Sequence, residues 1–357
     1  MSIGASDRPL TVTVVGAGVV GSAVALALAR RGAAVTLLEA QAEPGLSASG
    51  TNSGVLHTGF DSVPGELETE LILRAGALRD DVIEELGIPV LRCGAVMRGD
   101  IAAVAENARR NGVEVHERDG VLEVPGEAVT DPVAFTMSLA AAAERHGAEV
   151  RTSTPLEAPE PDGVVVNCAG LRADDVARLY GDESFGIYPR KGEFLVFDPP
   201  AGEPLDRILL PVPTKRTKGV LVFPTIDGRV VAGPTAVDGE DKDDWSVRPE
   251  ARDEILPKAV AMWPPLEGAE PIAAYAGLRP AGRDGANYVI GRSPAAPDRL
   301  INVAAIRSTG LTASLGIAEY VCEIVMGTPL PAPAPLLPAP PVASGEWWRR
   351  TAELHAA

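Results

Sequence analysis

A glycine-rich turn between a strand and a helix is the feature that most constrains this chain. The apolar, β-branched run Leu10–Val15 predicts a buried parallel strand, and the turn follows it at once with Gly16, Gly18 and Gly21. The next segment is rich in alanine and leucine and ends in two arginines and a glycine, which are helix stop signals. Residues 33–39 predict a second strand. This order is the G-x-G-x-x-G dinucleotide-binding arrangement of an α/β fold.

Each glycine of the turn has a physical role in holding a pyrophosphate. Gly16 permits the tight turn, Gly18 lets the backbone approach the anion, and Gly21 lets the helix pack closely on the strand. The start of the helix adds free N–H groups and a positive dipole end. Glu39 lies 18 positions after Gly21, where its carboxylate can accept hydrogen bonds from ribose hydroxyls and would repel a 2′-phosphate. The turn alone does not separate NAD from FAD.

A polar loop that follows the second strand favours FAD. Residues 47–59 (SASGTNSGVLHTG) are punctuated by glycines and can wrap a large cofactor with many hydrogen bonds. A typical nicotinamide-binding fold would instead continue quickly into its next helix and strand. The loop therefore predicts a flavin site directly after the nucleotide turn.

The later segments predict two structural parts. Helices are expected over residues 64–87 and 131–147, the second with Asp131 as its N-cap. From Gly186 the sequence becomes β-rich, and a final helix is expected over residues 310–325. The fold class is therefore α/β (α+β), a Rossmann-like FAD-binding domain with an inserted, mostly antiparallel β substrate domain. The expected boundaries are 1–90, 131–185 and 271–328 for the FAD-binding domain, 91–130 and 186–270 for the substrate domain, and 329–357 for a Pro/Ala-rich linker and tail.

Composition and charge argue against several classes of protein. The 357 residues are 46% apolar and 23% charged, as in soluble globular proteins with a substantial core. The formal charge of −17 argues against a nucleic-acid or anionic-membrane binder. The three cysteines lie far apart without zinc spacing, so neither a disulfide framework nor a metal site is expected. The absence of a long apolar run and of a secretory leader predicts a cytoplasmic chain with no transmembrane segment.

Four blocks of sequence resemble the D-amino-acid-oxidase-type superfamily of FAD-dependent oxidoreductases. They are GAGVVG with Glu39; SGTNSGVLHTG; VVVNCAG; and AGLRP followed by YVIG and IRSTGLTASLGIAEYV. The second and last blocks specifically resemble the L-2-hydroxyglutarate oxidase and dehydrogenase branch and the related glycerol-3-phosphate dehydrogenase branch. The resemblance implies FAD as the cofactor, bound largely by a discontinuous α/β frame beneath a β-rich substrate domain.

Two departures from the family pattern narrow this resemblance. Branches with a cysteine-linked flavin carry that cysteine between the AGLRP-like and IG-like segments, where this chain reads PAGRDGANYVIG. A thioether link is therefore not expected. The chain also ends soon after the last helix, without the extra C-terminal domain of many glycerol-3-phosphate dehydrogenases, which weakens the glycerol-phosphate interpretation.

The turn and the resemblance together define the residues expected to hold FAD. The resemblance implies that the ribityl chain and flavin are lined by Ser49, Thr51, Asn52, Ser53 and Gly54. It also implies that Gly310, Leu311 and Thr312 lie at the pyrimidine side of the isoalloxazine. A helix that starts there can point free N–H groups at the flavin C2 carbonyl and N1, where negative charge grows on reduction. The expected set is Gly16, Ala17, Gly18, Val19, Val20, Gly21, Glu39, Ala40, Ser49, Thr51, Asn52, Ser53, Gly54, Ala169, Gly170, Thr309, Gly310, Leu311 and Thr312.

Oxidation of an alcohol carbon requires a base for the proton and a cation that holds the substrate's anionic group. His57 lies in the cofactor loop, and its ordinary pKa of about 6.5 suits the base. Arg279 precedes Pro280, so we expect the strand to stop there and the guanidinium to clamp a carboxylate. A matching position in the resembled family faces the substrate carboxylate. Further expected substrate contacts are Tyr275, Lys191 and Arg307.

These residues predict an enzyme that oxidises the CH–OH of a small anionic hydroxy acid, similar to 2-hydroxyglutarate, by hydride transfer to flavin N5. One alternative is an amine or amino-acid substrate, as in glycine or sarcosine oxidases. An alternative of a different class is a non-catalytic, flavin-binding subunit of a larger complex. The sequence leaves open both the electron acceptor, which could be oxygen, a quinone or another oxidant, and homo-oligomerisation.

Overall fold

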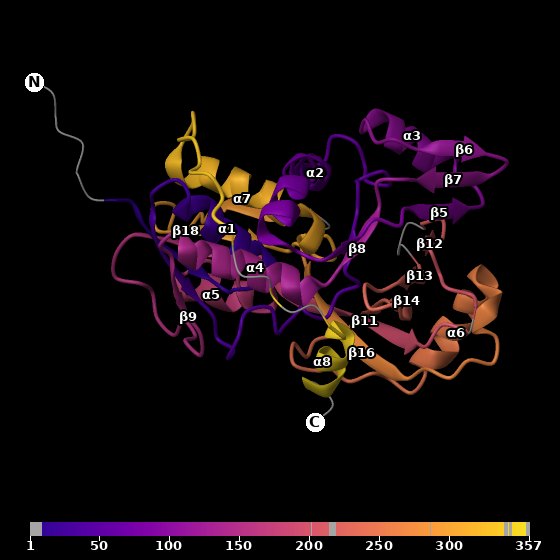
Figure 1. Ribbon diagram of the computed structural model, residues 1–357. Coiled ribbons are helices and arrows are strands. Elements are labelled where there is room, and N and C mark those ends of the chain that lie inside the picture. The colour runs from indigo at the N-terminus through magenta and orange to yellow at the C-terminus, as the bar shows by residue number, and fades with distance from the viewer. Residues whose placement is uncertain are drawn as a thin grey trace, which may run out of the picture.

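The computed structural model describes residues 9–200, 202–213, 219–285, 287–338, 342 and 345–354. The first eight residues of the expected FAD-binding domain and parts of the expected tail lie outside these ranges. Figure 1 shows the α/β part, with α1, α4 and α7, beside the part that contains β11 to β14 and α6. The mixed α/β class with parallel and antiparallel sheets is confirmed.

A six-stranded sheet forms the α/β part. Its strands are parallel except at one edge, where β17 runs antiparallel to β18. Short apolar strands suit this sheet because helices cover both of its faces. In spatial order the strands are β17 (Val289–Arg292), β18 (Leu300–Ala304), β10 (Val164–Asn167), β1 (Thr11–Val15), β2 (Ala34–Leu38) and β9 (Glu149–Arg151).

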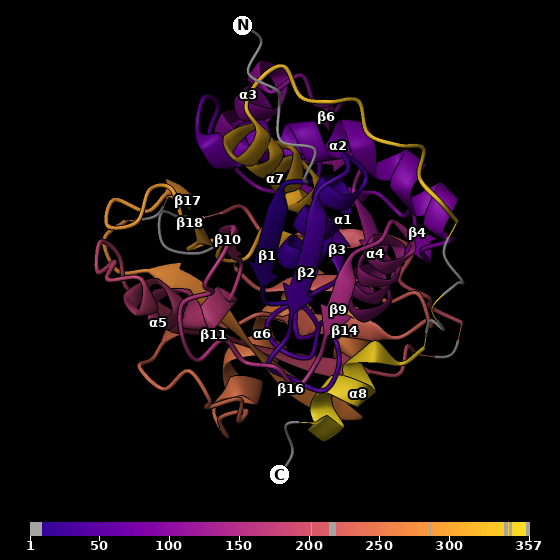
Figure 2. The same cartoon turned by 90° about the vertical axis from the view of Figure 1, so that its left-hand side faces the viewer.

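Small side chains let the helices pack closely on this sheet. Helix α1 (Val19–Ala29) is buried along almost its whole length and lies between α4 (Pro132–Arg145) and α7 (Gly310–Met326). Helix α2 (Leu67–Leu86) crosses α7 so closely that a Cβ on Gly316 would lie 2.1 Å from the Leu71 carbonyl oxygen. Helix α5 (Ala173–Leu179), after a 3₁₀ turn at Gly170–Arg172, packs on the opposite face of the sheet (Figure 2).

A nine-stranded, mostly antiparallel sheet forms the second part. Helix α6 (Ala251–Met262), with the 3₁₀ turn Pro264–Leu266, and helix α3 (Ala102–Arg110) cover parts of it with apolar side chains. The strands in spatial order are β15 (Val237–Asp238), β11 (Ile187–Phe197), β14 (Val230–Gly233), β13 (Leu221–Pro224), β12 (Ile208–Leu210), β5 (Ala95–Arg98), β7 (Val121–Val124) and β6 (His116–Arg118), with β16 (Ala273–Gly282) also on β11.

Strand β16 differs from the expectation in two ways. Residues 273–282 pair with β11 in the antiparallel sheet, although the expected boundary places them in the FAD-binding domain. The strand also does not stop at Arg279 but continues to Gly282. It can pass through Pro280 because that residue lies opposite Pro189, so the two residues without an N–H group share one rung of the ladder.

A small three-stranded sheet positions the expected base. Strand β8 (Ala128–Thr130) lies between β3 (Val55–Leu56) and β4 (Val90–Leu91). Val55 is paired with Val129 and Leu56 with Ala128. Continuing this antiparallel register brings residue 57 opposite residue 127, a juxtaposition that depends on tertiary structure.

The chain after α7 lies against the rest of the molecule. Its Pro/Ala segment hydrogen-bonds to the end of α1, where the Ala334 N–H donates to the Arg30 carbonyl at 2.7 Å. Helix α8 (Trp347–Leu354) then packs on the second part, with Trp347 edge-on to Tyr275 at 5.5 Å between ring centroids. The Thr351 hydroxyl donates to the Gly50 carbonyl at 2.6 Å, so α8, which lies beside β16 in Figure 1, also contacts the expected cofactor loop.

Truncation of a tryptophan in α8 should destabilise the protein. Trp348 is 1% exposed, and its indole N–H donates to Asp227 at 3.0 Å. Trp348→Ala is expected to lower the free energy of unfolding by about 3–5 kcal/mol, because it opens a cavity and leaves the Asp227 carboxylate without this donor. Urea unfolding measures this change, and Glu353→Ala on the exposed face of α8 should stay within about 0.5 kcal/mol of wild type. Equal stabilities of the two variants would contradict a docked helix.

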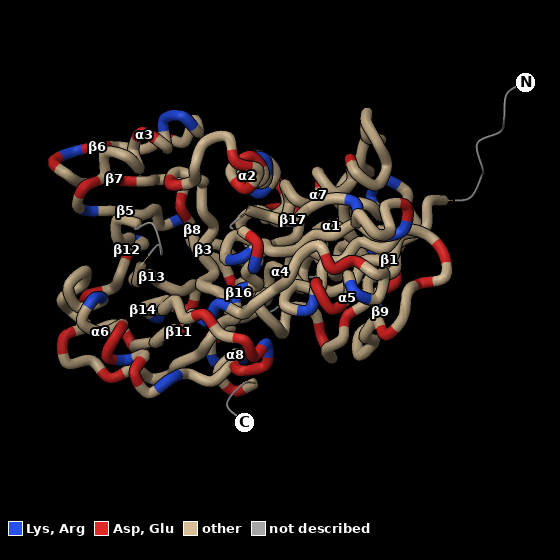
Figure 3. Tube along the Cα trace, turned by 180° about the vertical axis from the view of Figure 1, so that it is seen from behind, with Lys and Arg blue, Asp and Glu red and all other residues tan. Residues whose placement is uncertain are grey.

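None of the helices in the described ranges has both the length and the apolar character needed to cross a bilayer. Acidic residues are spread over both parts of the molecule and interspersed with basic ones (Figure 3).

Candidate active site

The glycine turn has the close contacts that its sequence predicts. Gly16 has a φ of +96°, and a Cβ there would lie 2.6 Å from the Cys168 carbonyl oxygen. A Cβ on Gly21 would lie 1.9 Å from the Gly16 carbonyl oxygen, so α1 could not approach the turn with a larger residue. The Ser49 hydroxyl accepts the Val19 N–H at 2.9 Å and thereby caps the start of α1.

Glu39 lies at the end of β2 and holds the turn from the side. One carboxylate oxygen accepts the Ala17 N–H at 2.7 Å and the other accepts the Gln41 N–H at 2.8 Å. Burial raises the pKa of Glu39, and these backbone donors oppose that rise. The carboxylate also lines the adjoining cavity, where it can accept a hydrogen bond from a ligand.

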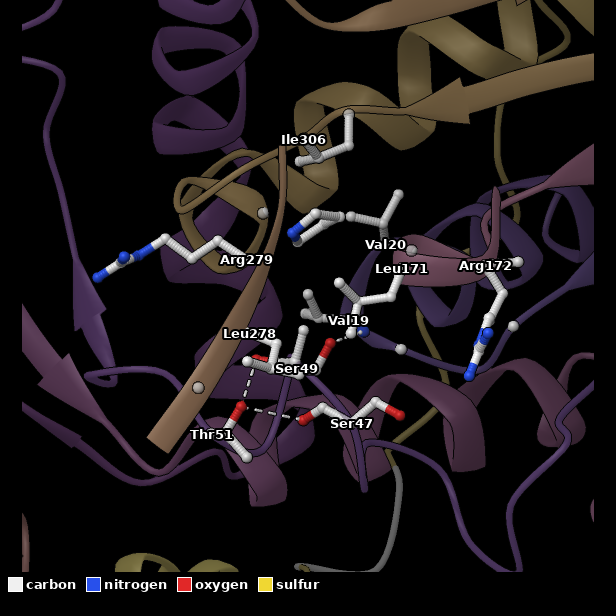
Figure 4. Close-up of a pocket in the computed structure, with 18 of the residues that line it drawn as sticks. Val19, Val20, Ser47, Ser49, Thr51, Leu171, Arg172, Leu278, Arg279 and Ile306 are labelled. Atoms are coloured by element: carbon white, nitrogen blue, oxygen red, sulfur yellow. Dashed lines mark hydrogen bonds between the residues drawn. The ribbon is translucent and has the colours of Figure 1, made fainter. Parts of the chain in front are cut away.

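A cavity of about 1000 Å³ runs from this turn to the start of α7 and to β16. That volume is at the upper end of the range of small-molecule and cofactor sites. Figure 4 shows Val19, Val20 and Leu171 on its wall, with Arg279 extending from β16 away from them. The expected cofactor residues that line it are Gly16, Gly18, Val19, Val20, Glu39, Ala40, Ser49, Thr51, Asn52, Ser53, Ala169, Gly170, Thr309, Gly310 and Leu311.

Four expected cofactor residues do not line the cavity, although they support its wall. Ala17 donates its N–H to Glu39, and Gly21 packs against the turn. Gly54 has a φ of +71° and approaches β8, where a Cβ would lie 2.4 Å from the Thr130 carbonyl oxygen. The Thr312 hydroxyl accepts the His57 N–H at 3.1 Å, so it links α7 to the loop.

His57 lies on the cavity wall and is held from three sides. Its Nδ1 is 2.8 Å from a carboxylate oxygen of Glu127, a fully buried residue. The other oxygen of Glu127 accepts the Thr58 N–H at 2.6 Å and the Thr58 hydroxyl at 2.8 Å. Arg79 donates to the His57 carbonyl at 3.1 Å. The ring therefore has one nitrogen paired with a buried carboxylate, which leaves Nε2 for a ligand.

Arg279 contributes a buried cation to the same cavity. Its guanidinium donates only to the carbonyls of Arg190 at 3.5 Å and Thr235 at 3.3 Å, and no carboxylate of the described chain pairs with it. Burial, and then the charge of Arg190, lower the pKa of Arg279 to about 10, so it remains charged at neutral pH. A Cβ on Gly192 would lie 2.3 Å from this guanidinium, so the glycine makes room for it.

The other expected substrate contacts are placed differently. Tyr275 does not line the cavity, because its ring stacks on Phe194 at 4.8 Å between centroids and its hydroxyl donates to the Asn52 carbonyl. Lys191 does not line it either, because its ammonium group pairs with Asp244 at 2.7 Å. Arg307 does line the cavity and is paired there with a carboxylate of Glu68, on α2.

Sequence reasoning missed Glu127, Gly192 and Glu68. Glu127 lies 70 positions from His57 and reaches it only through the pairing of β3 with β8. Gly192 lies between Lys191 and Glu193 in β11, and nothing in the sequence indicates that an arginine from another strand crosses it. The one available signal for Glu127 was a carboxylate directly before the run Ala128–Thr130, because a carboxylate that is buried usually needs a partner. Among the described residues, no cluster of histidine, cysteine and acidic side chains could hold a metal ion.

The fold and the cavity together define a dinucleotide-binding oxidoreductase. Residues 11–324 match the family model DAO, described as FAD dependent oxidoreductase. The chain belongs to this family of FAD-dependent oxidoreductases, and its cofactor is FAD. The residues present fit FAD, because Gly18 has no Cβ beside the Ser49 hydroxyl and α1 begins at the cavity.

The chain is also similar to individual enzymes in sequence and in structure. A glycerol 3-phosphate dehydrogenase of Caloramator mitchellensis is 28% identical over 353 residues, which cover 88% of this chain and 73% of that protein. An L-2-hydroxyglutarate dehydrogenase of Escherichia coli K12 is 25% identical over 63% of each chain. The structure of dithionite-reduced L-alpha-glycerophosphate oxidase from Mycoplasma pneumoniae with FAD bound has a TM-score of 0.82 at 25% identity, covering 89% of this chain and 95% of that chain.

Proposed function

We propose that this enzyme oxidises the CH–OH carbon of a small hydroxy acid similar to 2-hydroxyglutarate. One observation carries the proposal. The cavity holds a histidine backed by a buried carboxylate, together with a buried arginine that has no carboxylate partner in the described chain. A base and an anion clamp are the two protein groups that oxidation of a hydroxy acid requires.

Each group has a distinct role in this proposal. Arg279 binds the substrate carboxylate through two parallel N–H donors and so orients the reacting carbon. His57 accepts the hydroxyl proton at Nε2, because its Nδ1 faces Glu127. The glycine turn with Ser49 and Glu39 would hold the nucleotide half of FAD, and the residues at the start of α7 would face its flavin end. When bound, FAD supplies a two-electron acceptor for the hydride of the substrate C–H bond.

The charges around the cavity leave one described cation, Arg279, without a carboxylate partner. Apart from Arg279, the described cations on its wall each have a carboxylate partner, so their charges are already balanced. The guanidinium of Arg279 is therefore available to hold one anionic group of a substrate, and it can bind a carboxylate through two N–H donors. The paired cations are Arg172 with Asp243, Arg190 with Asp238, Lys242 with Asp174, and Arg307 with Glu68.

Glycerol 3-phosphate is the second candidate substrate. The relative that carries this substrate's name is 28% identical to the chain, against 25% for the L-2-hydroxyglutarate dehydrogenase. Its C2 hydroxyl offers the same CH–OH chemistry, and a guanidinium binds phosphate as well as carboxylate. The two substrates therefore differ in the anion presented to Arg279 rather than in the reaction.

Anaerobic flavin bleaching tests the proposal directly. The purified, FAD-loaded protein is mixed without oxygen with L-2-hydroxyglutarate, D-2-hydroxyglutarate, glycerol 3-phosphate, glycine or sarcosine, and the flavin absorbance is followed. Rapid bleaching by a hydroxy acid supports the proposal, and bleaching by glycerol 3-phosphate alone supports the second candidate. Bleaching by an amine alone favours an amine oxidase. A yellow protein that no donor in the panel bleaches favours a non-catalytic flavin-binding subunit. Reoxidation by oxygen or by a quinone analogue then identifies the acceptor.

A further inference from the structure

We infer that Glu127 is a positioning residue that keeps the proton of neutral His57 on Nδ1, so that Nε2 presents its lone pair to the cavity. This inference rests on the proposed function, because it takes His57 as the base. A histidine whose two nitrogens are free exchanges between tautomers, and only the form with an unprotonated Nε2 can accept a proton there. A fixed acceptor at Nδ1 removes this ambiguity.

The hydrogen bonds around Glu127 leave it a single role toward His57. The Thr58 N–H and hydroxyl both donate to one carboxylate oxygen, at 2.6 and 2.8 Å. The other oxygen faces His57 Nδ1 at 2.8 Å. An ionised carboxylate can only accept hydrogen bonds, so Nδ1 must carry the proton in this contact. Because Glu127 is 0% exposed, water does not compete for this oxygen.

A buried carboxylate needs a nearby positive charge to remain ionised. Arg79 of α2 supplies it, since it donates to the His57 carbonyl and its charge interacts with Glu127. Other titratable groups lie near Glu127 and His57, and Asp61 lines a small cavity together with His57. Burial raises the pKa of the Cys93 thiol to about 11, so it is neutral near pH 7, and the charges of Asp80 and Arg92 are paired with each other in solvent.

Hydrogen bonds hold the backbone of His57 as well as its ring. Its N–H donates to Thr312 at the start of α7, and its carbonyl accepts from Arg79 on α2. The register of β3 on β8 places residue 127 opposite it. Three elements from distant parts of the sequence therefore hold one histidine. This is the support expected of a group that must meet a substrate atom accurately.

Glu127→Gln separates this role from simple packing. The carbonyl of the substituted amide can keep both Thr58 hydrogen bonds, which turns the amide NH₂ group toward His57 Nδ1. Nδ1 must then accept, the proton moves to Nε2, and the ring loses its capacity as a base. We expect turnover with the donor that bleaches wild type to fall roughly 10²–10⁴-fold, with the visible spectrum of bound FAD preserved. Glu123→Gln on the exposed face of β7 is the matched control and should retain wild-type turnover.

A second measurement reads the proton position without turnover. The chain has only four histidines, so ¹⁵N-histidine NMR of the FAD-loaded protein can be assigned by comparison with His57→Ala. Wild type should show His57 with its proton on Nδ1 when neutral. Glu127→Gln should show the other tautomer, with the proton on Nε2, because the amide NH₂ group makes Nδ1 an acceptor.

The outcomes separate this inference from the proposed function. Glu127→Asp keeps the charge and should retain the wild-type tautomer, so this variant decides the question if the glutamine variant does not fold. An unchanged tautomer in Glu127→Gln, or a changed one in Glu127→Asp, overturns the inference. If no donor bleaches wild type yet the tautomer responds to Glu127→Gln, the proposed function fails while Glu127 still sets the proton position.

Discussion

Replacing His57 by alanine is expected to lower turnover roughly 10²–10⁴-fold while FAD remains bound. The variant removes the only described histidine on the cavity wall, so the hydroxyl proton has no acceptor at that position. The contacts expected to hold FAD come instead from the glycine turn, the loop after β2 and the start of α7. Stopped-flow measurement of flavin bleaching gives the rate of the reductive step, and the visible spectrum gives the FAD content.

His116→Ala is the control for His57→Ala. His116 lies on β6 with its side chain 59% exposed and does not line the cavity. Its removal should leave both the bleaching rate and the FAD content unchanged. Wild-type bleaching by the His57 variant would show that another group accepts the proton. Loss of FAD from that variant would show that His57 supports the cofactor more than the chemistry.

The second large effect is expected at Arg279. Arg279→Met keeps much of the side-chain volume and removes the charge that would hold the substrate's anionic group. Loss of one partner from a buried, hydrogen-bonded ion pair costs about 2–5 kcal/mol, so KM should rise roughly 30-fold to several thousand-fold. The variant should still bind FAD, because Arg279 extends away from Val19 and Val20 at the glycine turn (Figure 4), and the absorbance of the bound flavin checks this. Steady-state kinetics with the donor found by bleaching measures the change.

Two further variants separate the effect of the position of the Arg279 guanidinium from the effect of the protein's overall charge. Gly192→Ala places a Cβ where the Arg279 guanidinium now lies, so it should raise KM although every charge is retained. Arg252→Met removes an exposed arginine that pairs with Glu270 on the surface, and it should leave KM unchanged. A wild-type KM for Arg279→Met would contradict its assignment as the anion clamp. Equal effects of Arg252→Met and Arg279→Met would point to overall charge instead.

The parts predicted best are those whose determinants are close together in the sequence. The glycine turn with its flanking strand and helix is an example, because a left-handed φ at Gly16 and the close packing at Gly21 are local requirements. The N-cap of α4 is another, where Asp131 accepts the N–H groups of Val133 and Ala134 as expected. Arg279 also lies in the same cavity as His57, as the prediction of a base and a clamp requires.

Two of the expected substrate contacts do not line the cavity, because contacts between distant segments engage them elsewhere. Lys191 was expected to bind an anion, but the loop after β15 brings Asp244 to its ammonium group. Tyr275 is enclosed by Phe194 and by Trp347 of α8, a helix that the Pro/Ala-rich segment gave no reason to expect there. A strand sequence shows that alternate side chains share a face, but it does not show which partner covers that face.

The sequence by itself therefore determined the dinucleotide-binding turn, because a strand, three glycines and a helix start act through local backbone geometry. The polar loop after the second strand, together with the family resemblance, indicated FAD rather than NAD. Only the tertiary structure decided which charged groups remain available to a substrate. The pairing of β3 with β8 brings Glu127 to His57, and the crossing of Arg279 over Gly192 leaves one guanidinium without a carboxylate among the described residues. The interaction between two charges depends on the distance between them in the folded protein, not on their separation in the sequence. Which cation has a carboxylate partner therefore follows from the fold.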